Sequence, residues 1–202
     1  MSLFSDVYYE VERDAEFVLR ERGSKFFAFV YGVKSDQDIK EKLEGLKRQY
    51  PDATHHCYAW VMGARGEAQR ANDDGEPSNS AGRPILRSII SVGVTNVVVV
   101  VVRYFGGTLL GIPGLIESYG EAAESALRAA GRLEKFIEET YEISSAFEHE
   151  QEIHRLIAKY GARVLGSEYT EQVCYRVAVK AGVGRDFENA LFDHYQLSGK
   201  RM

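Results

Sequence analysis

Hydrophobic and polar residues recur with clear periods along the first third of the chain, and these periods predict strands alternating with helices. Aromatic and β-branched residues predict two strands joined by a tight turn within residues 16–33. Apolar positions at helical spacing after Ser35, a residue suited to capping, predict a helix that Pro51 ends. Residues 54–62 alternate as a third strand, and the segment 63–77, rich in Gly, Asn and Asp, is expected to be a loop.

The next part of the chain holds the longest apolar segments. A short helix is predicted over residues 81–91, followed by the strand Val97–Val102, which is apolar on both pleat faces and therefore predicts a sheet interior covered on both sides. A long helix follows, with Pro113 suited to its first turn and Gly131 to its end. Its expected buried stripe is Ile112, Leu115, Ile116, Tyr119, Ala122, Ala123, Ala126, Leu127 and Ala130.

After Gly131 the pattern changes, which predicts a second domain. The predicted elements are a strand over 136–148, a helix over 151–160, strands over 161–169 and 173–179, and a helix around Phe187. The order strand-helix-strand-strand-helix, with at most a short last strand, is typical of a ferredoxin-like fold. We therefore expect an α+β protein with a boundary near residues 133–137, dividing it into domains 1–134 and 135–202.

Composition narrows the class of protein. The 202 residues are 45% hydrophobic and 27% charged, as in an ordinary globular protein, and the net charge of -5 means that nucleic acid would have to bind a local patch. Two distant cysteines suit a reducing compartment and offer no disulfide framework. No apolar run approaches the roughly 18–20 residues of a bilayer span, and the start of the chain does not resemble a secretory signal. We expect a soluble cytoplasmic protein without a membrane partner.

The motif His55-His56-Cys57 is the first candidate for chemistry. Neighbouring strand residues point to opposite faces, so His55 and Cys57 share a face and His56 does not. A metal site would need further ligands, for which Asp73, Asp74 and Glu76 are available. A Cys57 nucleophile is disfavoured because His55 lies about 7 Å away along a strand. The favoured interpretation is a partly buried histidine pair and a core cysteine, with no metal.

The loop motif Asp73-Asp74-Gly75-Glu76-Pro77 is the second candidate. Residues of this kind most often form a solvated turn. Two alternatives remain open: a carboxylate cluster for a cation, and a set of acceptors that orients His56 or Arg103.

The segment Arg103–Gly114 is the third candidate and the most informative one. A strand that ends in Arg103-Tyr104-Phe105-Gly106-Gly107, followed by a helix that lacks a capping side chain, would gather a guanidinium and free backbone N–H groups, which suits an anion such as phosphate. The glycine spacing, including Gly111, matches neither the P-loop nor the dinucleotide fingerprint. Close packing of helix and sheet explains the glycines equally well.

Aromatic residues on two strands form a fourth candidate, which has a simple structural alternative. One predicted face gathers Lys25, Phe27, Phe29, Tyr31, His56, Tyr58 and Trp60. If helices covered only the opposite face of the sheet, this set would form a platform on which single-stranded bases stack. Packing in a core or between domains is the favoured explanation.

Three of these motifs, together and in order, resemble those of the IMPACT family in its bacterial form. They are His55-His56-Cys57 with Ala59-Trp60, the loop Asp73–Pro77 followed by Ala81-Gly82-Arg83-Pro84, and Val100–Gly107 with Leu110-Gly111. The resemblance covers roughly residues 20–130, and the C-terminal part is similar to the ferredoxin-like domain of bacterial members. Ile112-Pro113 stands where bacterial relatives tend to have Thr-Gly, which weakens a nucleotide-loop interpretation.

The resemblance implies a fold and a class of function. It implies an N-terminal domain of the ribosomal protein S5 domain 2-like fold before the ferredoxin-like domain. That pair resembles two neighbouring domains of elongation factor G, which implies binding to RNA or the ribosome. Eukaryotic members are translational regulators that act through an additional N-terminal domain. No catalytic residue is established for the family, so none is transferred.

The sequence therefore predicts a non-enzymatic binding protein in translation or its regulation. We expect RNA or the ribosome as partner, with a protein partner as a further possibility, and no cofactor. The predicted RNA- or anion-binding residues are His56, Arg103, Tyr104, Gly106, Gly107 and Gly111, beside a functional loop of Asp73, Asp74, Gly75, Glu76 and Pro77. Residues 55–107 hold five arginines against four acidic residues, so this region is less acidic than the whole chain. The alternative is a metal-assisted hydrolase or phosphoryl-handling enzyme that uses the His-His-Cys and Asp-Asp-Gly-Glu-Pro motifs.

Overall fold

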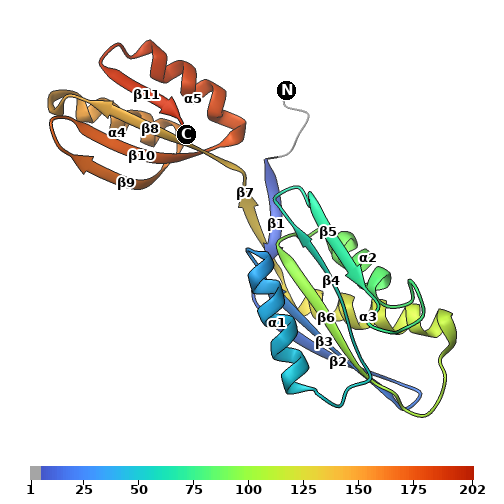
Figure 1. Ribbon diagram of the computed structural model, residues 1–202. Coiled ribbons are helices and arrows are strands. Elements are labelled where there is room, and N and C mark those ends of the chain that lie inside the picture. Colours follow the sequence, from blue (N-terminus) through green and yellow to red (C-terminus); the bar gives the residue numbers. More distant parts are fainter. Residues whose placement is uncertain (1–5) are drawn as a thin grey trace. The chain divides into compact units, whose positions relative to one another are not determined.

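The polyvaline strand is the centre of a five-stranded antiparallel sheet in the computed structural model, which describes residues 6–202 (Figure 1). The sheet belongs to the larger of two compact units, Tyr8–Lys135. Its strands, in spatial order, are β2 (Ala15–Glu21), β3 (Ser24–Gly32), β6 (Val97–Tyr104), β4 (His55–Met62) and β5 (Ala68–Asn72). Each strand pairs antiparallel with its neighbours.

Helices cover both faces of this sheet. α1 (Asp36–Gln49) packs on one face through Ile39 and Leu46. α2 (Gly82–Val92) and α3 (Gly111–Ala130) pack on the other. All six valines of β6 are fully buried, three toward each helical layer, which confirms the prediction of a strand covered on both sides.

The aromatic-platform hypothesis is wrong because α1 lies on that face. Phe27, Phe29, Tyr31, Tyr58 and Trp60 pack in the cluster that Ile39 and Leu46 of α1 close. The ring of Phe27, for example, stacks at 5.7 Å on Tyr50, the residue that follows α1. These aromatic rings are part of a second core, so bases have no access to their faces.

Most predicted elements are present, and the exceptions have local causes. Ser35 caps α1 by accepting a hydrogen bond from the backbone N–H of Asp38. The segment 63–77 is not entirely a loop, because it contains β5, a polar edge strand with no hydrophobic alternation to reveal it. The short strand β1 (Val7–Val11), which pairs with β7 (Arg132–Phe136), was not predicted either.

The smaller unit comprises Phe136–Met202 together with Asp6 and Val7. Its elements are β8 (Glu138–Ser145), a 3-10 turn (Phe147–His149), α4 (Glu150–Tyr160), β9 (Arg163–Tyr169), β10 (Val173–Lys180), α5 (Ala181–Asp193) and β11 (Leu197–Arg201). The sheet order is β11-β8-β10-β9, all antiparallel. The strand predicted over 136–148 is interrupted: β8 is its main part and the 3-10 turn its end. Alternate residues of β8 and β10 pack against Ile153 and Phe187 of the helices. No helix of residues 6–202 is both long and apolar enough to cross a membrane.

Candidate functional site

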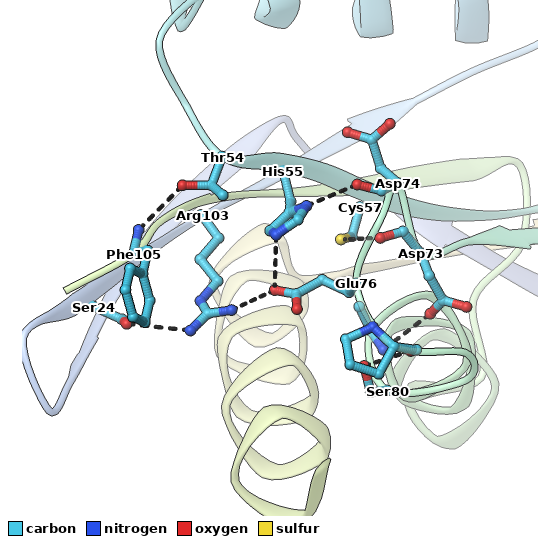
Figure 2. A network of polar contacts seen from close by, with 12 residues as sticks. Ser24, Thr54, His55, Cys57, Asp73, Asp74, Glu76, Ser80, Arg103 and Phe105 are labelled. Atoms are coloured by element: carbon cyan, nitrogen blue, oxygen red, sulfur yellow. Dashed lines mark hydrogen bonds and ion pairs between the residues drawn. The ribbon is translucent and has the colours of Figure 1, made fainter. Parts of the chain in front are cut away.

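A buried ion pair joins the end of β6 to the loop that follows β5. The guanidinium of Arg103 donates a hydrogen bond from Nη1 to Oε1 of Glu76, with 2.6 Å between the two atoms (Figure 2). Both side chains are almost fully buried. The alternative in which the loop supplies an acceptor to Arg103 is therefore confirmed, with Glu76 as that acceptor.

Further side chains complete this network. The hydroxyl of Tyr119, on α3, donates to the same Glu76 oxygen at 2.7 Å. The ring Nδ1 of His55 lies 2.8 Å from the carbonyl oxygen of Asp74; because a carbonyl only accepts, Nδ1 carries the proton, and Nε2 faces Glu76 at 3.8 Å. The thiol of Cys57 donates to the carbonyl of Asp73 at 2.9 Å. Glu76 is thus the acceptor around which the network is arranged.

Sequence reasoning missed Tyr119 and Ser24 as members of this site. The hydroxyl of Ser24 lies 3.4 Å from Nη2 of Arg103, across a separation of 79 residues that no local pattern reveals. Tyr119 was placed on the buried stripe of its helix. A buried tyrosine hydroxyl normally needs a hydrogen-bond partner, which is the signal that indicates a polar contact there.

Burial keeps the thiol and the tyrosine hydroxyl of this network uncharged and therefore unreactive. Burial raises the pKa of the Cys57 thiol well above its usual range, and it does the same to the pKa of the Tyr119 hydroxyl, so both groups are neutral at pH 7. The rings of Phe26 and Phe105 flank the Arg103 guanidinium at 5.3 and 5.7 Å. These features agree with the core-cysteine interpretation and leave no activated nucleophile in the network.

The loop Asp73–Pro77 is a structured connection rather than a solvated turn. The carboxylate of Asp73 accepts hydrogen bonds from the backbone N–H groups of Ala81 and Gly82 at 3.0 and 2.8 Å. α2 has no capping side chain at its own N-cap position, so Asp73 satisfies these helix-end donors from eight and nine residues away. Asp74 accepts from the backbone N–H of His56 at 2.7 Å, and Gly75 adopts a φ of 87°.

The three predicted glycines have different roles. A Cβ on Gly106 would lie 1.9 Å from the carbonyl carbon of Gly23, so only glycine permits this approach of two backbones. Gly107 has a φ of 84° with open space around it, and Gly111, with a φ of 70°, begins α3. Leu110 provides no side-chain cap, which confirms the predicted uncapped start of α3.

The structure does not bring all predicted contact residues together. Strand alternation places the side chains of His56 and Tyr104 on the α1 face, and that of Arg103 on the opposite face. Tyr104 donates from its hydroxyl to Asp52 at 2.8 Å. Burial lowers the pKa of His56, whose Nε2 has no hydrogen-bond partner among the described residues.

An open groove lies beside the ion pair, and we call it the corner groove. Its volume is about 400 Å³. It is lined by Thr54, His55, Glu76, Pro77, Arg103, Phe105, Leu109, Leu110, Gly111, Ile112 and Leu115. The polar side chains of Arg103 and His55 both face Glu76, whereas the remaining walls are mostly apolar. Phe105, Ile112 and especially Leu109, which is 83% exposed, present apolar surface to solvent.

The structure brings the residues of the alternative metal or hydrolase hypothesis together only in part, because His55 faces Glu76 at 3.8 Å but other members point elsewhere. His55 and His56 point to opposite faces of the sheet, and Asp73 is engaged at the start of α2. Within residues 6–202, no group of three or more His, Cys, Asp or Glu side chains is arranged to hold a metal ion.

Comparison with known proteins identifies the family to which this chain belongs. The model described as the Impact N-terminal domain matches residues 22–127, a range that contains every residue of the corner groove. IMPACT family member YigZ of Escherichia coli (strain K12) is 34% identical over 172 residues, which are 84% of each chain. The protein IMPACT homolog of Saccharomyces cerevisiae is 36% identical over 118 residues, which are 56% of this chain and 45% of the yeast protein. A solved structure, described as that of a hypothetical protein, is 29% identical and covers 98% of both chains with a TM-score of 0.71. This chain belongs to the IMPACT family.

Proposed function

We propose that this protein acts by binding rather than by catalysis, in translation or its regulation, and that its partner is RNA or a ribosomal surface in the cytoplasm. Membership in the IMPACT family supports this proposal, because eukaryotic members are translational regulators. The chain spans less than half of the yeast relative, so the role of that whole protein is carried over only as a proposal.

The corner groove is the observation that carries the proposal. The two charges in its floor are paired, because Glu76 accepts from both Arg103 and Tyr119, while the buried Nε of Arg103 has no hydrogen-bond partner among the described residues. Its rim is apolar and exposed at Phe105, Leu109 and Ile112. A concave, open, mostly apolar site whose polar network holds no activated nucleophile suits the holding of a partner.

In this proposal, arginines outside the groove bind the phosphate groups of RNA. The charge of Arg103 is compensated by Glu76, so it adds little to an anion-attracting field. Arg83 and Arg87 lie exposed on α2, and Arg70 lies exposed on β5. None of the ion pairs found within residues 6–202 involves these three arginines. They supply the local basic patch that an acidic protein needs for RNA.

The proposal extends to the two folds. We propose that residues 1–134 form an S5 domain 2-like domain and that residues 135–202 form a ferredoxin-like domain. Support for the second assignment comes from the order β8-α4-β9-β10-α5-β11 with the sheet order β11-β8-β10-β9.

Sedimentation with ribosomes tests the function. Tagged protein in cell lysate is expected to sediment with ribosomes at low salt and to be released as salt rises, since phosphate contacts release counterions. The double variant Arg83→Ala/Arg87→Ala should reduce the salt slope by about 2, at about 0.9 per phosphate contact. Its control, Arg176→Ala/Arg185→Ala, removes the same charge from exposed arginines of the smaller unit and should leave the slope unchanged.

A variant of the corner groove distinguishes apolar contacts of the groove from phosphate contacts of the arginines. Leu109→Asp should weaken sedimentation at every salt concentration, because it places a carboxylate on the apolar rim. Binding that survives nuclease treatment would count against an RNA partner. The proposal would be contradicted if the protein did not sediment with ribosomes at low salt. It would also be contradicted if neither Arg83→Ala/Arg87→Ala nor Leu109→Asp changed the sedimentation.

A further inference from the structure

Four side chains with metal-binding atoms converge in the smaller unit, and we call them the tyrosine cluster. They are Glu150 and His154 of α4, Tyr169 at the end of β9, and Tyr175 of β10. The hydroxyl oxygens of Tyr169 and Tyr175 each lie 2.7 Å from Oε1 of Glu150, and they lie 2.8 Å from each other. Nε2 of His154 lies 3.2 Å from the hydroxyl oxygen of Tyr175 and 3.7 Å from Oε1 of Glu150. None of these residues takes part in the function proposed above.

Three elements of the smaller unit hold the cluster in place. Glu150 and His154 are one helical turn apart, so their side chains lie on the same face of α4. Tyr169 lies opposite Val173, two residues before Tyr175, so both tyrosines project from the same face of the β9–β10 pair. The rings of the two tyrosines pack edge to face with centroids 6.4 Å apart, and the ring of His154 packs on Tyr175 at 5.3 Å. The ligand atoms are therefore held together before any ion binds.

The three oxygens of the cluster have one proton too few for their contacts. Hydrogen bonds from Tyr169 and Tyr175 lower the pKa of Glu150, so its carboxylate is ionised at pH 7 and carries no proton. Each phenol carries one proton, so two protons serve three oxygen–oxygen contacts. One of these contacts therefore brings two oxygens together without a proton between them. The ion-pair partner of Glu150 is His154 rather than a lysine or arginine, so no fixed positive charge offsets this crowding.

We propose that the tyrosine cluster is a binding site for a ferric ion. An octahedral ion with ligands at about 2.0 Å holds neighbouring ligands about 2.8 Å apart, which is the spacing of the three oxygens. One carboxylate and two phenolates carry three negative charges, which neutralise Fe³⁺ and would exceed the charge of a divalent ion. Binding releases the two phenolic protons to solvent, and bonds from iron to the three oxygens replace the hydrogen bonds of the cluster. His154 supplies a neutral Nε2 as the fourth ligand.

The chemistry of the tyrosines favours iron over other cations. Hydrogen bonding to Tyr169 and burial raise the pKa of Tyr175, so an ion must be strongly acidic to displace this proton at pH 7. Mg²⁺ and Ca²⁺ bind carboxylates and carbonyls, whereas tyrosinate is a known ligand of iron, as in the haem of catalase. Tyr175 is 5% exposed, but Tyr169 is 55% exposed. An ion can therefore enter from solvent on that side, where water completes its coordination.

Titration of the full chain with ferric nitrilotriacetate at pH 7 tests the proposal. Addition of about one equivalent of iron should produce a charge-transfer band from tyrosinate to iron in the visible spectrum. This band requires a phenolate bound to the ion, so it reports on the tyrosines and not on iron held by carboxylates alone.

Substitutions in the cluster should change this band in a defined way. Tyr169→Phe/Tyr175→Phe should abolish it, and each single change should weaken it. The control Tyr195→Phe alters a tyrosine of the same unit that is 91% exposed, and it should leave the band unchanged. Glu150→Gln and His154→Gln keep both tyrosines and should each raise the iron concentration at half-saturation at least about tenfold. Circular dichroism without iron checks that every variant keeps the fold.

Three results would overturn the proposal. One is the absence of the band in the presence of a small excess of iron. Another is a band that persists in Tyr169→Phe/Tyr175→Phe, or that Tyr195→Phe weakens equally, because either indicates an adventitious ion only. The third is loss of the band when an equal concentration of Zn²⁺ is added, which would indicate a divalent site formed by Glu150 and His154 alone.

Discussion

Glu76→Gln is expected to destabilise the larger unit strongly, although it changes one oxygen to an amide nitrogen. The Arg103–Glu76 pair joins atoms 2.6 Å apart, and only 6% and 4% of the two side chains are exposed. Removing the negative charge leaves a buried guanidinium without a counter-ion, which costs about 3–5 kcal/mol of unfolding free energy. The remaining amide oxygen still accepts from Arg103, so we expect the lower end, about 3 kcal/mol.

Glu124→Gln is the matched control. The Arg128–Glu124 pair on α3 has the same separation of 2.6 Å, but its side chains are 74% and 42% exposed. Exposed pairs one helical turn apart contribute about 0.3–0.5 kcal/mol. The comparison therefore holds the geometry of the pair constant and varies its burial.

Urea unfolding followed by tryptophan fluorescence provides the assay. Trp60 is the single tryptophan of the chain and lies on β4, so its emission reports on the larger unit. The double variant Glu76→Leu/Arg103→Met should lose less free energy than Glu76→Gln, because it leaves no buried charge behind. If Glu76→Gln cost no more than Glu124→Gln, the assignment of Glu76 as the buried counter-ion of Arg103 would be refuted.

Four other substitutions in the larger unit are tested by urea unfolding. Asp73→Ala removes the acceptor at the start of α2 and should cost about 0.5–2 kcal/mol, whereas a loss below that range would mean that water replaces the carboxylate. Gly106→Ala should cost about 2–3 kcal/mol because its Cβ meets backbone, whereas Gly107→Ala, in open space, should cost about 1 kcal/mol; equal losses would contradict the close approach. Burial lowers the pKa of His56, so the unfolded chain takes up its proton first, and the stability from this group is present above pH 6.5 and lost as pH falls from 6.5 through the lowered value. His56→Phe should flatten that acid limb of the stability curve, and an unchanged limb would assign it to other groups.

The spacing of apolar residues along the chain predicted those helices and strands that bury one face or both faces. β6 and α3 were found because a run of valines and a long apolar stripe have few alternative explanations. β5 was missed because an edge strand can consist of polar residues, and its backbone hydrogen bonds leave no trace in composition. The covering of the aromatic face by α1 also depends on how the chain returns over the sheet, which strand periodicity does not specify.

The candidate site was predicted in its parts rather than in its arrangement. Strand alternation separated His55 from His56 correctly, and the loop was recognised as a source of acceptors. The pairing of Arg103 with Glu76 joins residues 27 apart, and that of Tyr119 with Glu76 joins residues 43 apart. Such contacts follow from the packing of α3 on the sheet. Reasoning from local sequence therefore identified Arg103 and the loop that supplies its acceptor, but it left open which carboxylate of the loop pairs with it.

The position of β6 within its sheet has a consequence for the order in which the chain folds during synthesis. β3 and β4 both pair with β6, which follows them in the sequence and lies between them. A nascent chain that has emerged only as far as residue 96 therefore has two strands whose inner edges await the same missing neighbour. The hairpin of β2 and β3 can form early, but the sheet closes only after residue 104 leaves the exit tunnel, and until then both edges are sites where chaperones or other nascent chains can bind.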